Sequence, residues 1–168
     1  MMPNWCKGNI RLRGKSAAIM DFLRNELECV GYRKFPDGLE SKPVEIEDFY
    51  GEVVVKKPDS MKGTAYCVFH IKETRRNFID EEFEVYLGDD EEEIKTVCID
   101  EAKAAWGFAA APYLEKARKY GIDIRIVGFE RGMQFAQVIE IIGGEIVKDR
   151  EVKYNDWMWE CPMPNMGG

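Results

Sequence analysis

The chain has 168 residues, a formal net charge of −7, 45% hydrophobic residues and 12% aromatic residues. This length predicts a single domain over residues 1–168 with a substantial core, and the composition excludes an intrinsically disordered chain. No apolar run approaches the ~20 residues that a membrane-spanning helix needs, and the first residues lack the basic and apolar regions of a signal peptide. We therefore expect a cytoplasmic protein that has no membrane partner.

The acidity is concentrated in one segment. Residues 80–93 contain nine Asp and Glu residues and no Lys or Arg, which leaves 22 of the 31 acidic residues against 24 basic ones elsewhere. This distribution argues against a basic footprint over the whole protein, although it leaves room for a small basic patch. The segment is most simply a solvated loop around a short element at 83–87. The alternative is an acidic surface that binds a basic partner.

The cysteines are widely spaced and odd in number, and no C-x-x-C motif occurs. Disulfide frameworks and zinc sites both need paired ligands, so we expect free thiols, several of them in the core, and neither a metal nor a cofactor. The five are Cys6, Cys29, Cys67, Cys98 and Cys161.

The first predicted elements are a strand and a helix. Apolar and polar residues alternate from Cys6 to Arg13, which is typical of a half-buried strand that ends at Gly14. Ser16 can cap a helix that continues to Val30, with Gly31 as its stop. A strand followed directly by an amphipathic helix is a βα unit.

A loop-rich insertion is expected at about 32–94, because Pro and Gly residues punctuate its first half. Within it, residues 44–48 and 52–57 predict a short hairpin. Residues 65–72 predict a strand from their β-branched and aromatic content, and residues 73–79 predict either a helix or a strand.

The next stretch has high helical propensity, but Gly107 and Pro112 oppose one long helix. We therefore predict a strand at 95–105, a turn, and a helix at 110–120 with Pro112 in its first turn. Gly121 follows as the residue that ends this helix.

The last regular elements are strands. Residues 122–127 alternate again, and a turn is predicted at 128–132. Residues 133–142 and 145–154 then form two strands that Gly143 and Gly144 join in a hairpin.

The order of these elements predicts an α+β fold of the ferredoxin-like class. It is a split βαβ sandwich with two helices on one face of an antiparallel or mixed sheet, plus the C-terminal β-hairpin. The tail, 155–168, contains Trp157 and Trp159, and its aromatic side chains predict that it packs on the body of the domain.

Three stretches resemble the YubB-type ferredoxin-like domain family. They are Met2–Asn9, Ala105–Gly107 and Phe129–Phe135, and the resemblance covers the first 30 residues and roughly 95–168. Proteins of this family are encoded on plasmids, phages and integrative conjugative elements. The resemblance implies the ferredoxin-like fold and a setting in a mobile genetic element, and it implies no catalytic residue.

Four candidate binding residues lie in the second half of the chain: Trp106, Tyr113, Glu130 and Arg131. Trp106 either caps the core or anchors a partner, since Trp is enriched at binding hot spots. Glu130 and Arg131 either clamp a ligand or belong to a solvated turn. The question that the sequence leaves open is whether the four line a common concave pocket or lie apart.

Arg11 and Arg13 are the other candidates, because they point outward from the first predicted strand. In a ferredoxin-like sheet they would lie beside Asp123 and Arg125. They would then form either cross-strand charge pairs or a positive patch for phosphate or single-stranded nucleic acid. The aromatic run that RNA-recognition domains carry on such strands does not occur in the sequence.

No catalytic motif such as G-x-S-x-G, H-E-x-x-H or a Gly-rich phosphate loop occurs, and His70 is the only histidine. We therefore expect a non-catalytic accessory or interaction protein of a mobile element, with a protein partner from the element or its host. The alternatives are a single-stranded nucleic-acid-binding protein that uses the Arg11 and Arg13 face, or an acidic inhibitor of a host defence protein through residues 80–93. The oligomeric state stays open.

Overall fold

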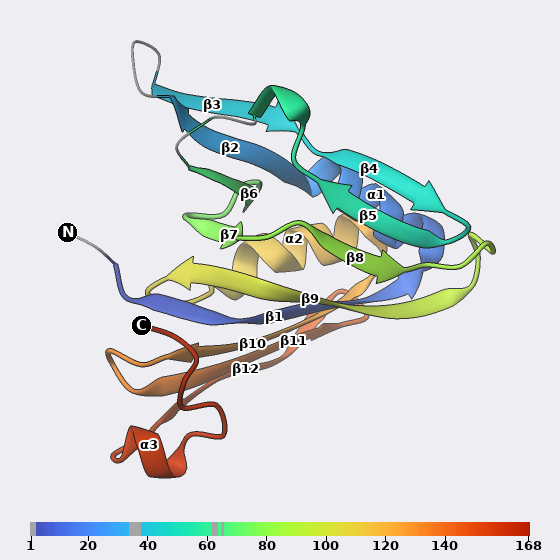
Figure 1. Ribbon diagram of the computed structural model, residues 1–168. Coiled ribbons are helices and arrows are strands. Elements are labelled where there is room, and N and C mark those ends of the chain that lie inside the picture. The colour runs from blue at the N-terminus through green and yellow to red at the C-terminus, as the bar shows by residue number, and fades with distance from the viewer. Residues whose placement is uncertain (1–2, 34–37, 62–63, 65) are drawn as a thin grey trace.

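A computed structural model describes residues 3–33, 38–61, 64 and 66–168. Most of the chain forms a nine-stranded sheet with the order β12-β11-β10-β1-β9-β7-β6-β2-β3, in which each neighbouring pair is antiparallel (Figure 1). Its strands are β1 (Trp5–Lys15), β2 (Leu27–Arg33), β3 (Gly38–Pro43), β6 (Cys67–Ile71), β7 (Asn77–Ile79), β9 (Ile94–Ala105), β10 (Asp123–Glu130), β11 (Phe135–Ile142) and β12 (Glu145–Lys153).

A smaller sheet and short helices complete the fold. The small sheet has the order β4-β5-β8, and its strands are β4 (Glu45–Phe49), β5 (Glu52–Lys56) and β8 (Phe83–Tyr86). The helices are α1 (Ser16–Glu26), α2 (Ala110–Tyr120), α3 (Trp157–Glu160) and the 3-10 turn η1 (Asp59–Met61). Within the described residues, no helix has the length and apolar character needed to cross a membrane.

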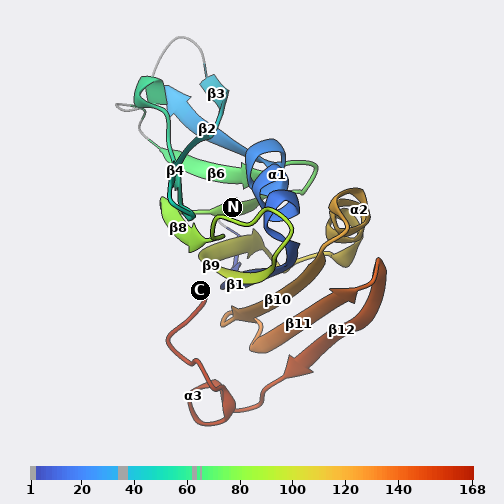
Figure 2. The ribbon, with the colours of Figure 1, turned by 90° about the vertical axis from the view of Figure 1, so that its right-hand side faces the viewer.

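The core lies on one face of the large sheet. Inward side chains of β1, such as Ile10 and Leu12, join Phe22 of α1, Tyr113 of α2 and Val53 of the small sheet in one buried cluster. α1, α2 and the small sheet thus cover this face. The opposite face is here called the open face, and among the described elements it carries the C-terminal tail. Figure 2 shows α3 and α2 on opposite sides of β10–β12.

The predicted ferredoxin-like sandwich is wrong, because the chain is mostly β and its helices are small. The predicted insertion, 32–94, is the main cause: it supplies β3, β6 and β7 to the large sheet and all three strands of the small sheet. β10, β1 and β9 are direct neighbours, but β7 and β6 separate β9 from β2. Hydrogen bonding to strands far along the chain, which local patterns do not reveal, decided this architecture.

The first helix is shorter than predicted. It ends at Glu26, and Leu27 and Cys29 continue as inward residues of β2, where pairing with β6 outweighs helical propensity. Ser16 lies in the first turn and does not cap it. Its hydroxyl donates to the Leu87 carbonyl at 2.8 Å, and its N–H donates to the carbonyl of Glu93 at 2.9 Å.

Several local predictions are confirmed. β9 is followed by a helix over 110–120, and Gly121 adopts the left-handed conformation (φ 63°, ψ 40°) that ends it. Gly143 and Gly144 form the turn between β11 and β12, and β4 pairs with β5 in the predicted hairpin. β6 begins at Cys67; position 65 of its predicted range lies outside the described residues. β10 extends to Glu130, three residues beyond its predicted end.

The tail packs on the body of the domain, as predicted, and it does so on the open face through one buried tryptophan. Trp157 is 4% exposed, and its indole N–H donates to the Pro164 carbonyl at 2.7 Å. The backbone N–H of Gly168 donates to the Trp5 carbonyl at 3.2 Å, which ties the last residues to β1. Trp157 contacts Phe129, Ala136 and Cys161 in a second, smaller apolar cluster.

Trp157→Ala is expected to release this tail, because it removes the buried indole and its hydrogen bond. Amide hydrogen exchange should accelerate at Gly168, while the amide of Ile10 in the sheet keeps its protection. Trp159→Ala is the matched control, since that side chain is 86% exposed. Equal exchange at Gly168 in both variants would contradict the assigned role of Trp157.

Candidate binding surface on the open face

The four candidate residues of the second half of the chain lie in different environments. Trp106 follows β9 and is 49% exposed, whereas Tyr113 is fully buried on the helix side, where its hydroxyl accepts a hydrogen bond from Asn77. Glu130 is buried, and its carboxylate accepts hydrogen bonds from the backbone N–H groups of residues 132 and 133. Arg131 is exposed. The structure therefore does not bring these four side chains together.

Trp106 instead belongs to a cluster of rings and cations at one end of the open face. We call it the aromatic–cation surface, and it consists of Trp5, Tyr66, Arg76, Phe78, Lys103 and Trp106. The guanidinium carbon of Arg76 lies 5.5 Å from the ring centre of Trp5 and 5.9 Å from that of Trp106. Lys103 Nζ lies 4.6 Å from the ring centre of Trp5, and the rings of Trp5 and Phe78 contact edge to face.

Two turns place these residues together. Arg76 precedes β7 and Trp106 follows β9, and both have positive φ angles, 56° and 60°. The N–H of Ala105 donates to the Arg76 carbonyl at 3.2 Å, and the N–H of Trp106 donates to the Asn4 carbonyl at 2.8 Å. These hydrogen bonds therefore fix the backbone of both turns against the start of β1, so the side chains of Arg76 and Trp106 leave the backbone close to Trp5.

Lys103 is the most buried cation of this surface. Its side chain is 8% exposed, and its ammonium contacts Asp80 at 2.6 Å and the Tyr66 hydroxyl at 3.3 Å. Burial alone would lower the pKa of Lys103, but these hydrogen bonds raise it above its ordinary value. Lys103 is therefore a cation at neutral pH, and its ammonium lies over both the Trp5 and the Tyr66 rings.

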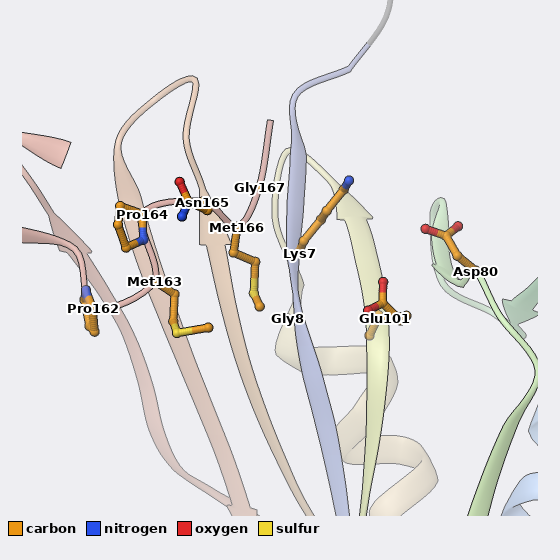
Figure 3. Close-up of a pocket in the computed structure, with 11 residues that line it drawn as sticks. Lys7, Gly8, Asp80, Glu101, Pro162, Met163, Pro164, Asn165, Met166 and Gly167 are labelled. Carbon is orange, nitrogen blue, oxygen red and sulfur yellow. The ribbon is translucent and has the colours of Figure 1, made fainter. Parts of the chain in front are cut away.

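A groove of about 530 Å³ lies between the tail and the strands next to this surface. Figure 3 shows Met163 and Met166 of the tail on one side, Lys7 of β1 and Glu101 of β9 at the centre, and Asp80 on the other side. Lys7 is the cross-strand neighbour of Lys103, so the groove continues the aromatic–cation surface. Methionine side chains adapt to irregular surfaces, which suits a groove wall that meets a partner.

Arg11 and Arg13 occupy the other end of the open face. Arg13 is paired directly with Asp123, with its Nη2 2.7 Å from the carboxylate, so the predicted cross-strand ion pair is present there. Arg11 lies opposite Arg125 in the register of β1 and β10. The two alternatives were cross-strand charge pairs and a positive patch. Arg13 forms a charge pair with a carboxylate, whereas Arg11 faces another cation.

The acidic segment is partly built into the fold. The carbonyls of Glu91 and Glu93 accept hydrogen bonds from the first N–H groups of α1, and Glu92 forms an ion pair with Lys15. Asp80 contacts Lys103 as described above. A segment that satisfies a helix N-terminus is held in one conformation, so its structural role accounts for part of its composition.

The cysteines and the histidine show no arrangement typical of a catalytic or metal site in the described part of the chain. Within the described residues, no group of three or more possible ligands could hold a metal ion. The cysteines are free thiols, and burial raises the pKa of Cys6 and of Cys29 to about 12, which keeps both protonated at neutral pH. His70 contacts Glu28 at 2.9 Å and the Thr74 carbonyl at 3.0 Å.

Trp106 of this surface was predicted from the sequence as a candidate binding residue, whereas Tyr66, Arg76 and Lys103 were missed. These three come from segments that are distant in the chain, and none belongs to a motif. The only signal was the composition of residues 66–78, which combines aromatic and basic residues. Searches with this chain found no matching family model, no matching curated protein and no matching solved structure.

Proposed function

We propose that this protein is a non-catalytic interaction protein that binds another protein through the aromatic–cation surface. One observation carries the proposal: two exposed rings on the open face lie next to cations. Arg76 lies over the Trp106 ring, and Lys103 lies over the Tyr66 ring. Tryptophan, tyrosine and arginine are the residue types that dominate the energy of protein interfaces, and they act in clusters.

The arrangement of the cations favours a protein over stacked nucleobases. Arg76 lies over both Trp5 and Trp106, and Lys103 lies over Trp5, so these ring faces already have cationic partners. A base that stacked on Trp5 would have to displace a cation–π contact worth about 0.5–2 kcal/mol. The net charge of −7 also opposes general attraction of a nucleic acid.

The partner is expected to present carboxylates next to apolar side chains. Arg76 is exposed beside Trp106, its chain neighbour Arg75 is exposed as well, and Lys7 is exposed in the adjoining groove. A carboxylate that pairs with Arg76 would make charge-assisted hydrogen bonds while an apolar group contacts the Trp106 ring. The resemblance described above suggests that such a partner would be encoded by a mobile element or its host.

Photo-crosslinking in the cells that produce the protein tests this proposal. A photoreactive residue at position 106 should give a discrete adduct with another protein, and the adduct should survive nuclease treatment. The same residue at position 159, which is equally aromatic but lies in α3, is the control and should not give that adduct.

The crosslinked partner can then be purified and its affinity measured. Arg76→Ala and Trp106→Ala should each weaken binding by about 2 kcal/mol, as hot-spot residues do. The absence of a specific adduct at position 106 would refute the proposal. An adduct with twice the mass of this chain would show that the partner is a second copy of the chain and not a different protein.

A further inference from the structure

A shallow hollow of about 210 Å³ lies at the far end of the open face from Trp106. Three arginines from two neighbouring strands line it: Arg11 and Arg13 of β1 and Arg125 of β10. The other polar residues of its lining are Thr96, Asp123 and Glu140. None of these residues belongs to the aromatic–cation surface, so the hollow is a separate feature of the protein.

The central feature of the hollow is a like-charge pair. Arg11 and Arg125 stand directly opposite each other in the antiparallel register of β1 and β10. Like charges in directly opposed positions destabilise a sheet, and an acidic residue at either position would remove the repulsion. Within the described part of the chain, Arg11 has no carboxylate partner; the neighbour on its other side is Cys98 of β9.

Two carboxylates hold the flanking guanidinium groups. Asp123 accepts hydrogen bonds from Nε and Nη2 of Arg13 at 2.9 and 2.7 Å, and Glu140 accepts one from Nε of Arg125 at 2.8 Å. Each guanidinium has five N–H donors, so these bonds orient the two groups without using all their donors. Arg11 itself contacts the Cys98 thiol and has no carboxylate partner among the described residues, so oriented donors beside it lower the entropic cost of binding an anion.

We infer that this hollow binds a phosphate group. A tetrahedral oxyanion placed over Arg11 would relieve the repulsion between Arg11 and Arg125 and would accept bidentate hydrogen bonds from guanidinium groups. Lys148, 3.7 Å from Glu140, adds a fourth cation beside the hollow, against the two carboxylates. The same chemistry recognises a phosphate on a small molecule and a phosphate in the backbone of a single-stranded nucleic acid.

Three probes test the inference and separate the two sources of phosphate: inorganic phosphate, adenosine monophosphate and a short fluorescein-labelled oligothymidylate. Calorimetry with the first two, and fluorescence anisotropy with the third at low salt, should show saturable binding for at least one probe. Binding of the small probes alone identifies a small phosphorylated ligand. Binding of the oligonucleotide alone, weakening with added salt, identifies a nucleic-acid backbone.

Variants locate the binding on the protein. Arg11→Gln should weaken binding about tenfold or more, because it removes charge-assisted hydrogen bonds. Arg11→Lys keeps the charge but loses the bidentate geometry, so its affinity should lie between those of Arg11→Gln and the wild type. Arg24→Gln is the matched control, since Arg24 is an exposed cation on α1, away from this face. Unsaturable signals with all three probes, or equal affinities of Arg11→Gln and the wild type, would overturn the inference.

Discussion

Glu26→Ala is expected to lower the free energy of unfolding by about 3–5 kcal/mol, because it leaves a buried ammonium without a partner. The Glu26 and Lys116 side chains are only 3% and 2% exposed, and their charged atoms lie 2.5 Å apart. Tyr120 donates to the same carboxylate at 2.7 Å and Lys119 at 3.0 Å. This network joins the end of α1 to α2, so its loss should weaken the helical layer. Urea denaturation measures the effect.

Two controls separate the buried pair from ordinary surface charges. Glu92→Ala removes the exposed partner of Lys15 and should leave the midpoint of urea denaturation close to that of the wild type, because solvent screens this pair. The double variant Glu26→Leu/Lys116→Met should be more stable than Glu26→Ala, because apolar side chains remove both buried charges. A loss below about 1 kcal/mol in Glu26→Ala would show that the ammonium finds water or another acceptor.

The same network predicts a pH dependence. Burial alone would raise the pKa of Glu26, but the hydrogen bonds from Lys116, Tyr120 and Lys119 lower it from 4.5 to about 2. A carboxyl whose pKa is lowered by folding stabilises the protein fully above its ordinary pKa and loses this contribution as the pH falls through the folded value. The difference between wild type and Glu26→Ala should therefore persist above pH 4.5 and shrink towards pH 2.

Gly8→Ala is expected to cost about 3 kcal/mol or more, since the new methyl group has no space. A Cβ at this position would lie 1.7 Å from the Val127 carbonyl oxygen and 2.9 Å from the Gly128 Cα. These are backbone atoms of β10, which pairs with β1 through Gly8 and Gly128, so no side-chain rotation can relieve the overlap. The midpoint of urea unfolding should fall sharply, or the variant should fail to fold.

Gly121→Ala is the control for this prediction. Gly121 has φ 63°, and a Cβ there would meet nothing within 4 Å. Its replacement should cost only the penalty of a left-handed non-glycine residue, about 1–2 kcal/mol. If Gly8→Ala unfolded at the same urea concentration as the wild type, β1 and β10 would have to move apart to make room for the methyl group without any loss in the free energy of unfolding. That result would argue against a rigid centre of the open face.

The close pairing of β1 and β10 also determines which side chains are neighbours on the open face. It sets Arg11 opposite Arg125, and the pairing of β1 with β9 sets Lys7 opposite Lys103. The two regions proposed as binding sites therefore lie on the same central strand, at opposite ends. Variants such as Arg11→Gln and Trp106→Ala should accordingly have independent effects on stability, because the two residues share no contact.

Local sequence patterns predicted those elements whose residues carry their own signal. The alternation of Cys6–Arg13 predicted β1 and its inward face, and Pro112 with Gly121 predicted both ends of α2. The Gly143–Gly144 pair predicted the β11–β12 hairpin. These features follow from the period of a strand, the fixed φ of proline and the freedom of glycine at positive φ, which all act within a few residues.

Elements that depend on distant partners were not predictable in this way. The sequence predicted that the first helix continues to Val30. Residues 27–33 form β2 instead, because β6 and β3 pair with them on either side. The same reason explains the binding surfaces: Arg76 meets Trp106 because β7 pairs with β9, and Arg11 meets Arg125 because β1 pairs with β10. Local patterns thus located most turns and the apolar faces of several strands. Which strands are neighbours followed from the three-dimensional fold, because strands can form backbone hydrogen bonds whatever their separation along the chain.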